Sequence, residues 1–285
     1  MIDPLTTLEQ MMNNPEGWDF SGARELYAWV DLGTCKSKVI VVDEQGRPRA
    51  AAMRRSEGIG SGLILDYFGT LTLLRGMMEE IRSRCPLPIE RGATSFPPQT
   101  ESGNIHTTRY ILQGAGLEVL RVLDEPSAAN RFLNLQDGAI VDIGGGTTGI
   151  ALIRGGRIVR TWDEATGGVH LSLVLSGHLR VSFEEAEAIK TDRARQSEIL
   201  PIVRPVIDKI SSIVESALQG LPPVKTVGLV GGTCALEGLT ELVAANLGLE
   251  VFRPRFPKVV TPYGIALSCL EGEDLDLPFS QAANG

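Results

Sequence analysis

The sequence has few of the features that mark membrane, secreted or nucleic-acid-binding proteins. Its 285 residues include 27 basic and 35 acidic side chains, a formal net charge of -8, with no long basic run. Binding to a phosphate backbone therefore gets little support. No window reaches the roughly 18 uninterrupted apolar residues of a bilayer-spanning helix, and the start lacks the basic flank and apolar stretch of a signal peptide. We expect a cytoplasmic protein with neither a membrane nor a nucleic acid as partner.

Cysteine is also scarce. The four cysteines lie far apart in the chain, and none is at metal-ligand spacing from a histidine. Neither a disulfide framework nor a zinc site is expected, and the thiols should be reduced. The four are Cys35, Cys85, Cys234 and Cys269.

What the sequence does contain is a glycine cluster, IVDIGGGTTGI, at residues 140–150. Gly144, Gly146 and Gly149 fall on the spacing G-x-G-x-x-G. A dinucleotide-binding domain needs a helix directly after this fingerprint and a carboxylate about 20 residues on. Residues 150–161, IALIRGGRIVRT, are instead two β-rich runs around a glycine pair, which is typical of a hairpin. The dinucleotide interpretation therefore fails on its context.

The same pattern occurs twice. Residues 28–50 and 139–161 both run strand, V-D-[LI]-G, small polar turn, strand, glycine turn, strand, which indicates an internal duplication. In each copy an aspartate, Asp31 or Asp142, precedes a turn whose backbone N–H groups could hold an anion. The carboxylates would repel a polyphosphate unless a cation such as Mg2+ bridges them through its waters. The alternative is two ordinary tight hairpins, in which aspartate is favoured because it suits turns.

The segments around the second copy also suggest a site. Apolar spacing predicts helices over 68–81, 107–115 and 203–218. Glu125 follows a predicted strand and precedes Pro126, so its carboxylate could orient a water for attack on a phosphate, or simply complement a helix dipole. At 226–243 a strand, a glycine pair and a helix follow one another, where Gly231 and Gly232 would let a base or ribose approach.

Five stretches in this order resemble the actin-like, sugar-kinase and heat-shock-chaperone ATPase superfamily from about Ala28 to Leu270. They are VDLGT (30–34, phosphate-1), DEPSAA (124–129, connect-1), VDIGGGT (141–147, phosphate-2), LVGGT (229–233, adenosine) and TPYGIAL (261–267, connect-2). Within it, TSFPPQT, DEATGGVHLSL and FEEAEAIK resemble the ethanolamine-utilisation protein J family over nearly the full length. The resemblance implies an α/β, two-lobed, ribonuclease-H-like duplicated ATPase fold. The expected parts are an N-terminal segment (1–21), lobe I (22–140 with 262–272), lobe II (141–261) and a disordered acidic tail (273–285).

The resemblance also implies a function and a set of site residues. Family members are encoded with bacterial microcompartment enzymes and are described as chaperone-like, with ethanolamine ammonia-lyase as a suspected client. We therefore expect a chaperone-like protein that binds ATP or ADP and hydrolyses ATP slowly with Mg2+, its lobe closure altering its hold on a client. The alternatives are a nucleotide-dependent filament or scaffold built from copies of the chain, and a degenerate binder without ATPase activity. Asp31 and Asp142 match the Mg2+ ligands, and Glu125 the residue that positions water. The other implied nucleotide contacts are Gly33, Thr34, Cys35, Gly144, Gly145, Gly146, Thr147, Thr148, Gly231, Gly232 and Thr233, with Glu187 and Lys190 at the ribose.

Three departures from the superfamily pattern qualify this expectation. Only eleven residues separate Lys190 from Ile202, so the small subdomain that walls the adenine in relatives should be absent and nucleotide binding weak. The heat-shock chaperones' catalytic lysine has no clear counterpart, since Lys36 and Lys38 lie too early in the chain. We also expect no substrate-binding domain after Leu270. Without the resemblance, Glu187 and Lys190 would be a solvated salt pair on a helix.

The first twenty residues predict a helix of their own. Asp3 would cap it, Pro4 would lie in its first turn, and Leu5, Leu8 and Met11 or Met12 would share a face with Ile2. This face either packs on the protein's own surface or serves as a targeting peptide for a microcompartment.

Overall fold

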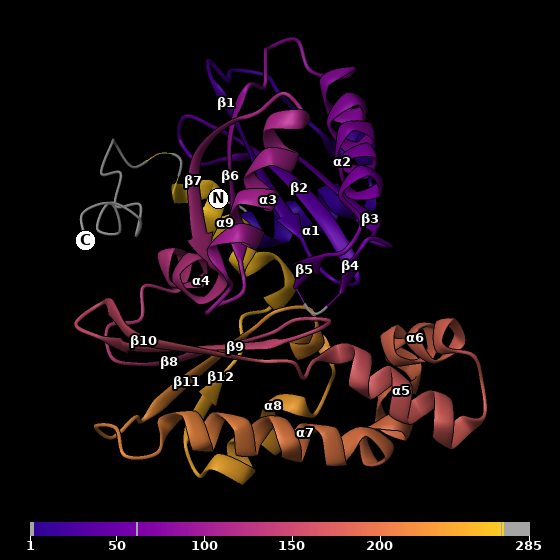
Figure 1. Cartoon of the computed structure of the whole chain (residues 1–285), viewed down its shortest axis with the longest axis vertical. Coiled ribbons are helices and arrows are strands. Elements are labelled where there is room, and N and C mark those ends of the chain that lie inside the picture. The colour runs from indigo at the N-terminus through magenta and orange to yellow at the C-terminus, as the bar shows by residue number, and fades with distance from the viewer. Residues whose placement is uncertain (1–2, 61, 269, 271–285) are drawn as a thin grey trace.

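The computed structural model describes residues 3–60, 62–268 and 270. Two five-stranded sheets of the same design form its two lobes (Figure 1). The strand order is β3-β2-β1-β6-β7 in lobe I and β10-β9-β8-β11-β12 in lobe II. In each sheet the first three strands pair antiparallel and the last two add in parallel, so the predicted duplication is confirmed. The strands are β1 (Leu26–Leu32), β2 (Lys36–Asp43), β3 (Pro48–Arg55), β6 (Arg91–Phe96), β7 (Glu118–Asp124), β8 (Gly138–Ile143), β9 (Thr148–Arg154), β10 (Arg157–Glu164), β11 (Thr226–Val230) and β12 (Glu250–Phe252), with a small β4 (Ile59–Gly60) and β5 (Leu63–Ile64) pair.

The helices lie in three layers around these sheets. Helices α2 and α3 cover the outer face of the lobe I sheet. On the outer side of the lobe II sheet, α7 and α8 pack against the strands, while α5 and α6 pack against α7 beside the sheet (Figure 1). Helices α1, α4 and α9 belong to the core between the sheets. The helices are α1 (Pro4–Asn13), α2 (Tyr67–Arg82), α3 (Ser102–Gly114), α4 (Glu125–Leu133), α5 (Gly168–Leu179), α6 (Phe183–Thr191), α7 (Gln196–Leu218), α8 (Leu239–Leu247) and α9 (Val260–Ser268), with 3-10 turns η1 (Pro15–Gly17), η2 (Arg193–Arg195), η3 (Thr233–Ala235) and η4 (Pro257–Val259).

The apolar runs of the strands follow from burial on both faces. In β1, Ala28 and Val30 face the α2 and α3 core, while Trp29 between them faces the inner core with α1 and α9. Strands covered on both faces read as continuous hydrophobic segments, because each face needs apolar side chains. The inner core takes residues from both sheets, such as Ile40 in lobe I and Ile140 in lobe II. The lobes therefore share one packed layer.

Within that layer, α4 and α9 cross closely. A Cβ added at Gly264 of α9 would overlap the carbonyl oxygen of Ala128 in α4, so this position requires glycine. The lobe bounds expected from the sequence cut through β8 at residue 140 and through α9 at residue 261. Those bounds stay a prediction, and we name the lobes by their sheets.

The N-terminal helix is present and is packed on the protein itself. Asp3 caps α1 by accepting hydrogen bonds from the backbone N–H groups of Leu5 and Thr6. Leu5, Leu8 and Met11 are buried in the inner core. The face that a targeting peptide would have to expose is therefore engaged in the fold.

Some helices differ from their predicted ranges. Helix α7 begins at Gln196 rather than Val203 and runs through Pro201 and Pro205, because Ile199 and Val203 are buried in the lobe II core. Helix α3 begins at Ser102 rather than Thr107. Phe68, which was expected on the buried stripe of α2, is 78% exposed at the first turn.

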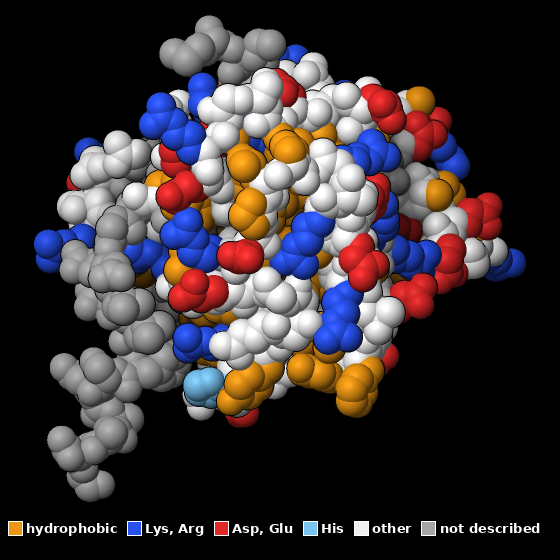
Figure 2. All heavy atoms as spheres, turned by 90° about the horizontal axis from the view of Figure 1, so that it is seen from above, with side chains coloured by type: hydrophobic (Ala, Val, Ile, Leu, Met, Phe, Trp, Pro, Cys, Tyr) orange, Lys and Arg blue, Asp and Glu red, His pale blue; other side chains and the backbone are white. Residues whose placement is uncertain are grey.

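The segment after α6 confirms one departure from the superfamily. The chain passes from α6 through the single turn η2 directly into α7, and no strand lies between these two helices. Cys269 and the predicted tail at 273–285 lie outside the described residues. Within the described ranges, no helix combines the length and apolarity needed to cross a bilayer. Figure 2 shows charges of both signs interspersed over the upper face of lobe I.

Candidate functional site

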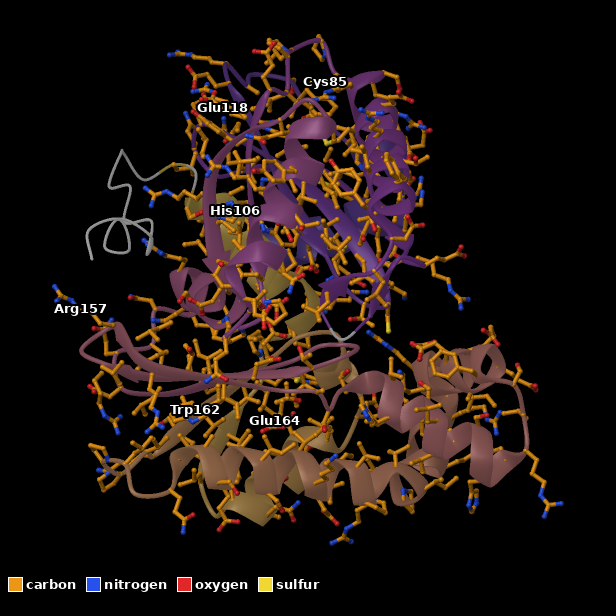
Figure 3. All side chains as sticks on the ribbon, in the orientation of Figure 1. Cys85, His106, Glu118, Arg157, Trp162 and Glu164 are labelled. Carbon is orange, nitrogen blue, oxygen red and sulfur yellow. The ribbon has the colours of Figure 1, made fainter. Side chains whose placement is uncertain are left out.

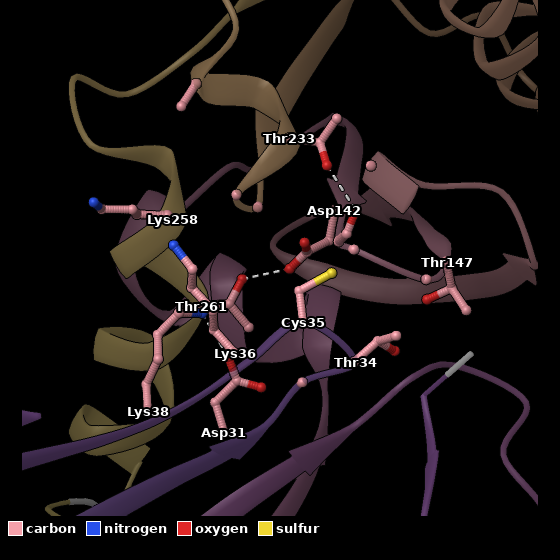
Figure 4. Close-up of a pocket in the computed structure, with 18 of the residues that line it drawn as sticks. Asp31, Thr34, Cys35, Lys36, Lys38, Asp142, Thr147, Thr233, Lys258 and Thr261 are labelled. Atoms are coloured by element: carbon pink, nitrogen blue, oxygen red, sulfur yellow. Dashed lines mark hydrogen bonds and ion pairs between the residues drawn. The ribbon is translucent and has the colours of Figure 1, made fainter. Parts of the chain in front are cut away.

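A cavity of about 330 Å³ lies where the two lobes meet, and the two matching turns line it from opposite sides (Figure 4). Residues 31–36 come from the β1–β2 turn of lobe I, and 142–147 belong to the β8–β9 turn of lobe II. A Cβ added at Gly145 would lie 2.5 Å from the Cys35 sulfur and 3.5 Å from the Cys35 backbone nitrogen, so the two turns approach closely. The volume is in the range of small-molecule sites. The duplicated turns thus meet across one cleft.

Asp142 is held on the lobe II side by contacts from two other segments. Its Oδ2 accepts a hydrogen bond of 2.6 Å from the Thr261 hydroxyl at the start of α9. Gly231 has a φ of +94°, and a side chain there would overlap Asp142 Oδ1, so glycine is required on both counts. Burial raises the pKa of Asp142 to about 6, although the Thr261 hydrogen bond lowers it.

Asp31 is held on the lobe I side by a lysine that follows it in the same hairpin. Lys38 is the register partner of Asp31 between β1 and β2, and its Nζ lies 2.7 Å from Asp31 Oδ2. Burial by itself would lower the pKa of Lys38, but the charge and hydrogen bond of Asp31, with help from Asp142 and Glu125, raise it above its ordinary value. The ammonium therefore stays charged in the wall of the cavity.

Glu125 reaches the same cavity from the start of α4. Burial raises its pKa well above the ordinary value, and the negative charges of Asp142 and Asp31 raise it further, while Lys38 lowers it. The carboxyl group therefore binds a proton more readily than an exposed glutamate does.

Asp163 is a further carboxylate near this site that the sequence reasoning missed. Figure 3 labels its neighbours Trp162 and Glu164 in β10 of lobe II. Trp162 packs on the outer core, so the next side chain in the strand faces the opposite side of the sheet, where Glu125 lies. Burial raises the pKa of Asp163 to about 7, against a hydrogen bond with Thr147 that lowers it. Its buried Oδ1 has no hydrogen-bond partner among the described residues.

The other end of the cavity carries the residues expected at the ribose. Lys190 donates hydrogen bonds to Glu187 Oε2 at 2.6 Å, Ser172 Oγ at 2.8 Å and the carbonyl oxygen of Gly168 at 2.8 Å. Burial alone would raise the pKa of Glu187, but Lys190 lowers it below its ordinary value. The pair is therefore a fixed, half-buried part of the cavity wall rather than a solvated salt bridge.

The glycine pair of the third motif lines the cavity beside these residues. Thr233 donates a hydrogen bond of 2.7 Å to the carbonyl oxygen of Gly144, which ties this loop to the β8–β9 turn (Figure 4). The motif continues into the 3-10 turn η3, and helix α8 begins only at Leu239. The expected helix N-terminus is therefore not at Gly231 and Gly232.

The structure brings nearly all of the expected residues to this one cavity. Thr148 is the exception: it is fully buried, and its hydroxyl donates to the carbonyl oxygen of Thr166 at 2.6 Å. Thr34 lines the cavity, and its hydroxyl accepts from the Gly62 N–H at 3.0 Å. The expected residues in the lining are Asp31, Gly33, Thr34, Cys35, Glu125, Asp142, Gly144, Gly145, Gly146, Thr147, Glu187, Lys190, Gly231, Gly232 and Thr233. Residues in the lining that were not expected include Lys36, Lys38, Gln196, Lys258 and Thr261.

The repeated sheets and the cleft between them define an actin-like protein of two lobes. The family model of cell division protein FtsA matches residues 139–265. The ethanolamine utilization protein EutJ of Escherichia coli (strain K12) is 39% identical over 244 residues, which cover 85% of this chain and 86% of that protein. The crystal structure of EutJ from Carboxydothermus hydrogenoformans superposes with a TM-score of 0.84 at 39% identity, covering 93% of this chain and 99% of that one. The chain belongs to the EutJ family.

A more distant solved structure shares the fold alone. MreB5 of Spiroplasma citri bound to ADP superposes with a TM-score of 0.70 at 16% identity, covering 86% of this chain and 96% of that one.

Proposed function

We propose that the interlobe cavity binds ATP and ADP, with the phosphates between the two matched turns and the nucleoside toward Glu187 and Lys190. The observation that carries this proposal is the close approach of the two turns, in which Gly145 meets Cys35 across the cleft. Turns of this kind present backbone N–H groups to an anion. The likeness to MreB5 bound to ADP supports the choice of ligand.

The adenine end of this proposed nucleotide site should contribute little to affinity. The direct connection from α6 through η2 to α7 leaves no β-containing subdomain to wall the base. Loss of stacking area lowers affinity, because burial of the flat base supplies much of the attraction. We therefore expect binding in the micromolar range or weaker.

Magnesium stays a prediction from the resemblance. Of its two expected ligands, Asp31 has Oδ2 committed to Lys38 and Asp142 has Oδ2 committed to Thr261. The described residues contain no group of three or more acidic, histidine or cysteine side chains arranged to hold a metal. An ion that bound both Oδ2 atoms directly would have to displace Lys38 and Thr261. The phosphate contacts proposed above do not depend on such an ion.

We further propose slow ATP hydrolysis, with Glu125 positioning the attacking water. Glu125 lines the cavity at the start of α4. The burial that raises its pKa favours the protonated carboxyl group, which can orient a water by hydrogen bonding. Closure of the lobes around the nucleotide would then change the hold on a client protein in ethanolamine utilisation, with ethanolamine ammonia-lyase as the candidate. This chaperone-like role, in the cytoplasm or beside a microcompartment, rests on the family resemblance.

Replacement of Gly232 by leucine tests nucleotide binding. Gly232 lines the cavity, and a Cβ added there meets no other atom within 4 Å, so the larger side chain should fill the nucleotide space without disturbing the fold. We expect calorimetry to show ADP binding weakened at least about tenfold. Gly103→Leu is the matched control, because an added Cβ there also meets nothing within 4 Å and the residue is exposed on α3. No ADP binding by the wild type, or equal binding by both variants, would contradict the proposal.

A further inference from the structure

Lys38 occupies an unusual position for a cation next to the expected metal ligands. It is carried by β2 and lies in the wall of the cavity, where its side chain is 13% exposed and that of its partner Asp31 is 15% exposed (Figure 4). The 2.7 Å contact between them joins the second strand of lobe I to the turn that faces the phosphates. The pair is thus largely shielded from solvent.

The charges around Lys38 come from both lobes. Asp31 contacts it directly, and Asp142 of lobe II and Glu125 of α4 line the same cavity. One ammonium therefore shares the cavity with three acidic side chains, and two of them, Asp31 and Asp142, are the carboxylates that the sequence predicts as metal ligands. A metal ion bound among them would be repelled by the ammonium and would have to displace it from Asp31.

The other lysines that line the cavity either pair with a different carboxylate or are exposed. Lys190 is fixed to Glu187, and Lys258 is paired with Glu9 of α1 at 2.8 Å. Lys36 is exposed at the rim of the turn. Among the described lysines that line the cavity, Lys38 is therefore the one that is paired with an expected metal ligand, Asp31.

We propose that the Lys38 ammonium is a built-in cation of this site, which takes the place of a divalent metal at Asp31 and lets the diphosphate of a nucleotide bind largely without Mg2+. The claim that a nucleotide binds largely without Mg2+ rests on the proposed function. The claim that Lys38 takes the place of a metal concerns the protein without nucleotide. The hairpin register accounts for the contact between Lys38 and Asp31, since the two residues are directly opposite each other in the β1–β2 hairpin.

The first measurement needs no nucleotide and uses Mn2+ as the metal probe. Electron paramagnetic resonance of free Mn2+ should detect little binding to the wild type. Lys38→Met leaves the carboxylates without a cation, so Mn2+ should bind it at least about tenfold more tightly than the wild type. Lys225→Met is the control, because Lys225 is exposed at the lobe II surface next to β11. The wild-type titration decides the matter even if Lys38→Met does not fold, because tight Mn2+ binding by the empty wild type would overturn the proposal.

The second measurement compares ADP binding in Mg2+ and in a chelator. Chelation should weaken binding to the wild type and to Lys225→Met by less than about threefold, and binding to Lys38→Met by at least about tenfold. A tenfold loss for the wild type would overturn the inference while leaving nucleotide binding intact. If the wild type bound no ADP in either condition, the proposed function would fail, and the Mn2+ titration would still decide the role of Lys38.

Discussion

Asp163 is a residue whose ionisation should be visible in the stability of the protein. Its folded-state pKa of about 7 exceeds the ordinary 3.8, so between these values the folded protein binds a proton that the unfolded chain does not. Proton binding by Asp163 therefore stabilises the folded protein at low pH, and this stabilisation is lost as pH rises toward 7. Asp163→Asn removes the titration, so the variant should exceed the wild type in stability at pH 8 and lose this advantage toward pH 5.

Thermal unfolding at the two pH values measures the effect. After a discount for partial exposure, we expect about 1 kcal/mol at pH 8, or roughly 2–4 °C in Tm. Asp137→Asn, at an exposed position, is the matched control. A difference between variant and wild type that does not change with pH would contradict the assignment of a raised pKa to Asp163.

At this scale the sequence predicts the cavity residues well where a turn fixes them, and less well inside strands. Thr147 lines the cavity, but Thr148 begins β9 and faces the opposite side, because side chains alternate along a strand. Lys38 could have been found from the hairpin register with Asp31. Asp163 could have been placed from its register with Gly149. Its burial depends on packing across the lobes, which no local pattern reports.

At the scale of elements, α1 should behave as part of the core rather than as a free peptide. Leu8 is fully buried in the inner core, so Leu8→Ala should lower the free energy of unfolding by about 2–5 kcal/mol. Urea unfolding gives the measurement. Leu65→Ala is the control, because Leu65 is 75% exposed and its truncation should cost less than about 0.5 kcal/mol. An unchanged midpoint for Leu8→Ala would revive the targeting interpretation of the N-terminal face.

The type of most elements follows from periodicity, while their ends depend on tertiary contacts. The hairpin around Gly155 and Gly156 is confirmed as β9 and β10, because local turn chemistry sets it. The start of α7 could not be read in the same way. Proline usually ends a helix, yet Pro201 and Pro205 lie inside one whose buried stripe includes Ile199. Burial against the lobe II sheet outweighs the missing N–H groups.

At the scale of the whole molecule, the cavity and the interlobe layer are joined through the starts of two helices. Glu125 is the first residue of α4, and Thr261, which bonds Asp142, is the second of α9. The two helices pack through Gly264 against Ala128, between the sheets. A nucleotide in the cavity would therefore touch the ends of both helices that connect the lobes. Occupancy of the site should stiffen this layer rather than the outer faces.

Amide hydrogen exchange with and without ADP tests this connection. Exchange should slow at least about threefold in peptides covering α4 and α9, because the ligand suppresses local opening of the layer. Peptides from α2, on the outer face of lobe I, serve as the internal reference and should not change. Gly232→Leu should reduce the protection at the same ADP concentration, because it binds ADP more weakly. Protection confined to residues 31–36 and 144–147 would mean that the nucleotide binds without engaging the interlobe helices, and lobe closure could not then carry a signal to a client.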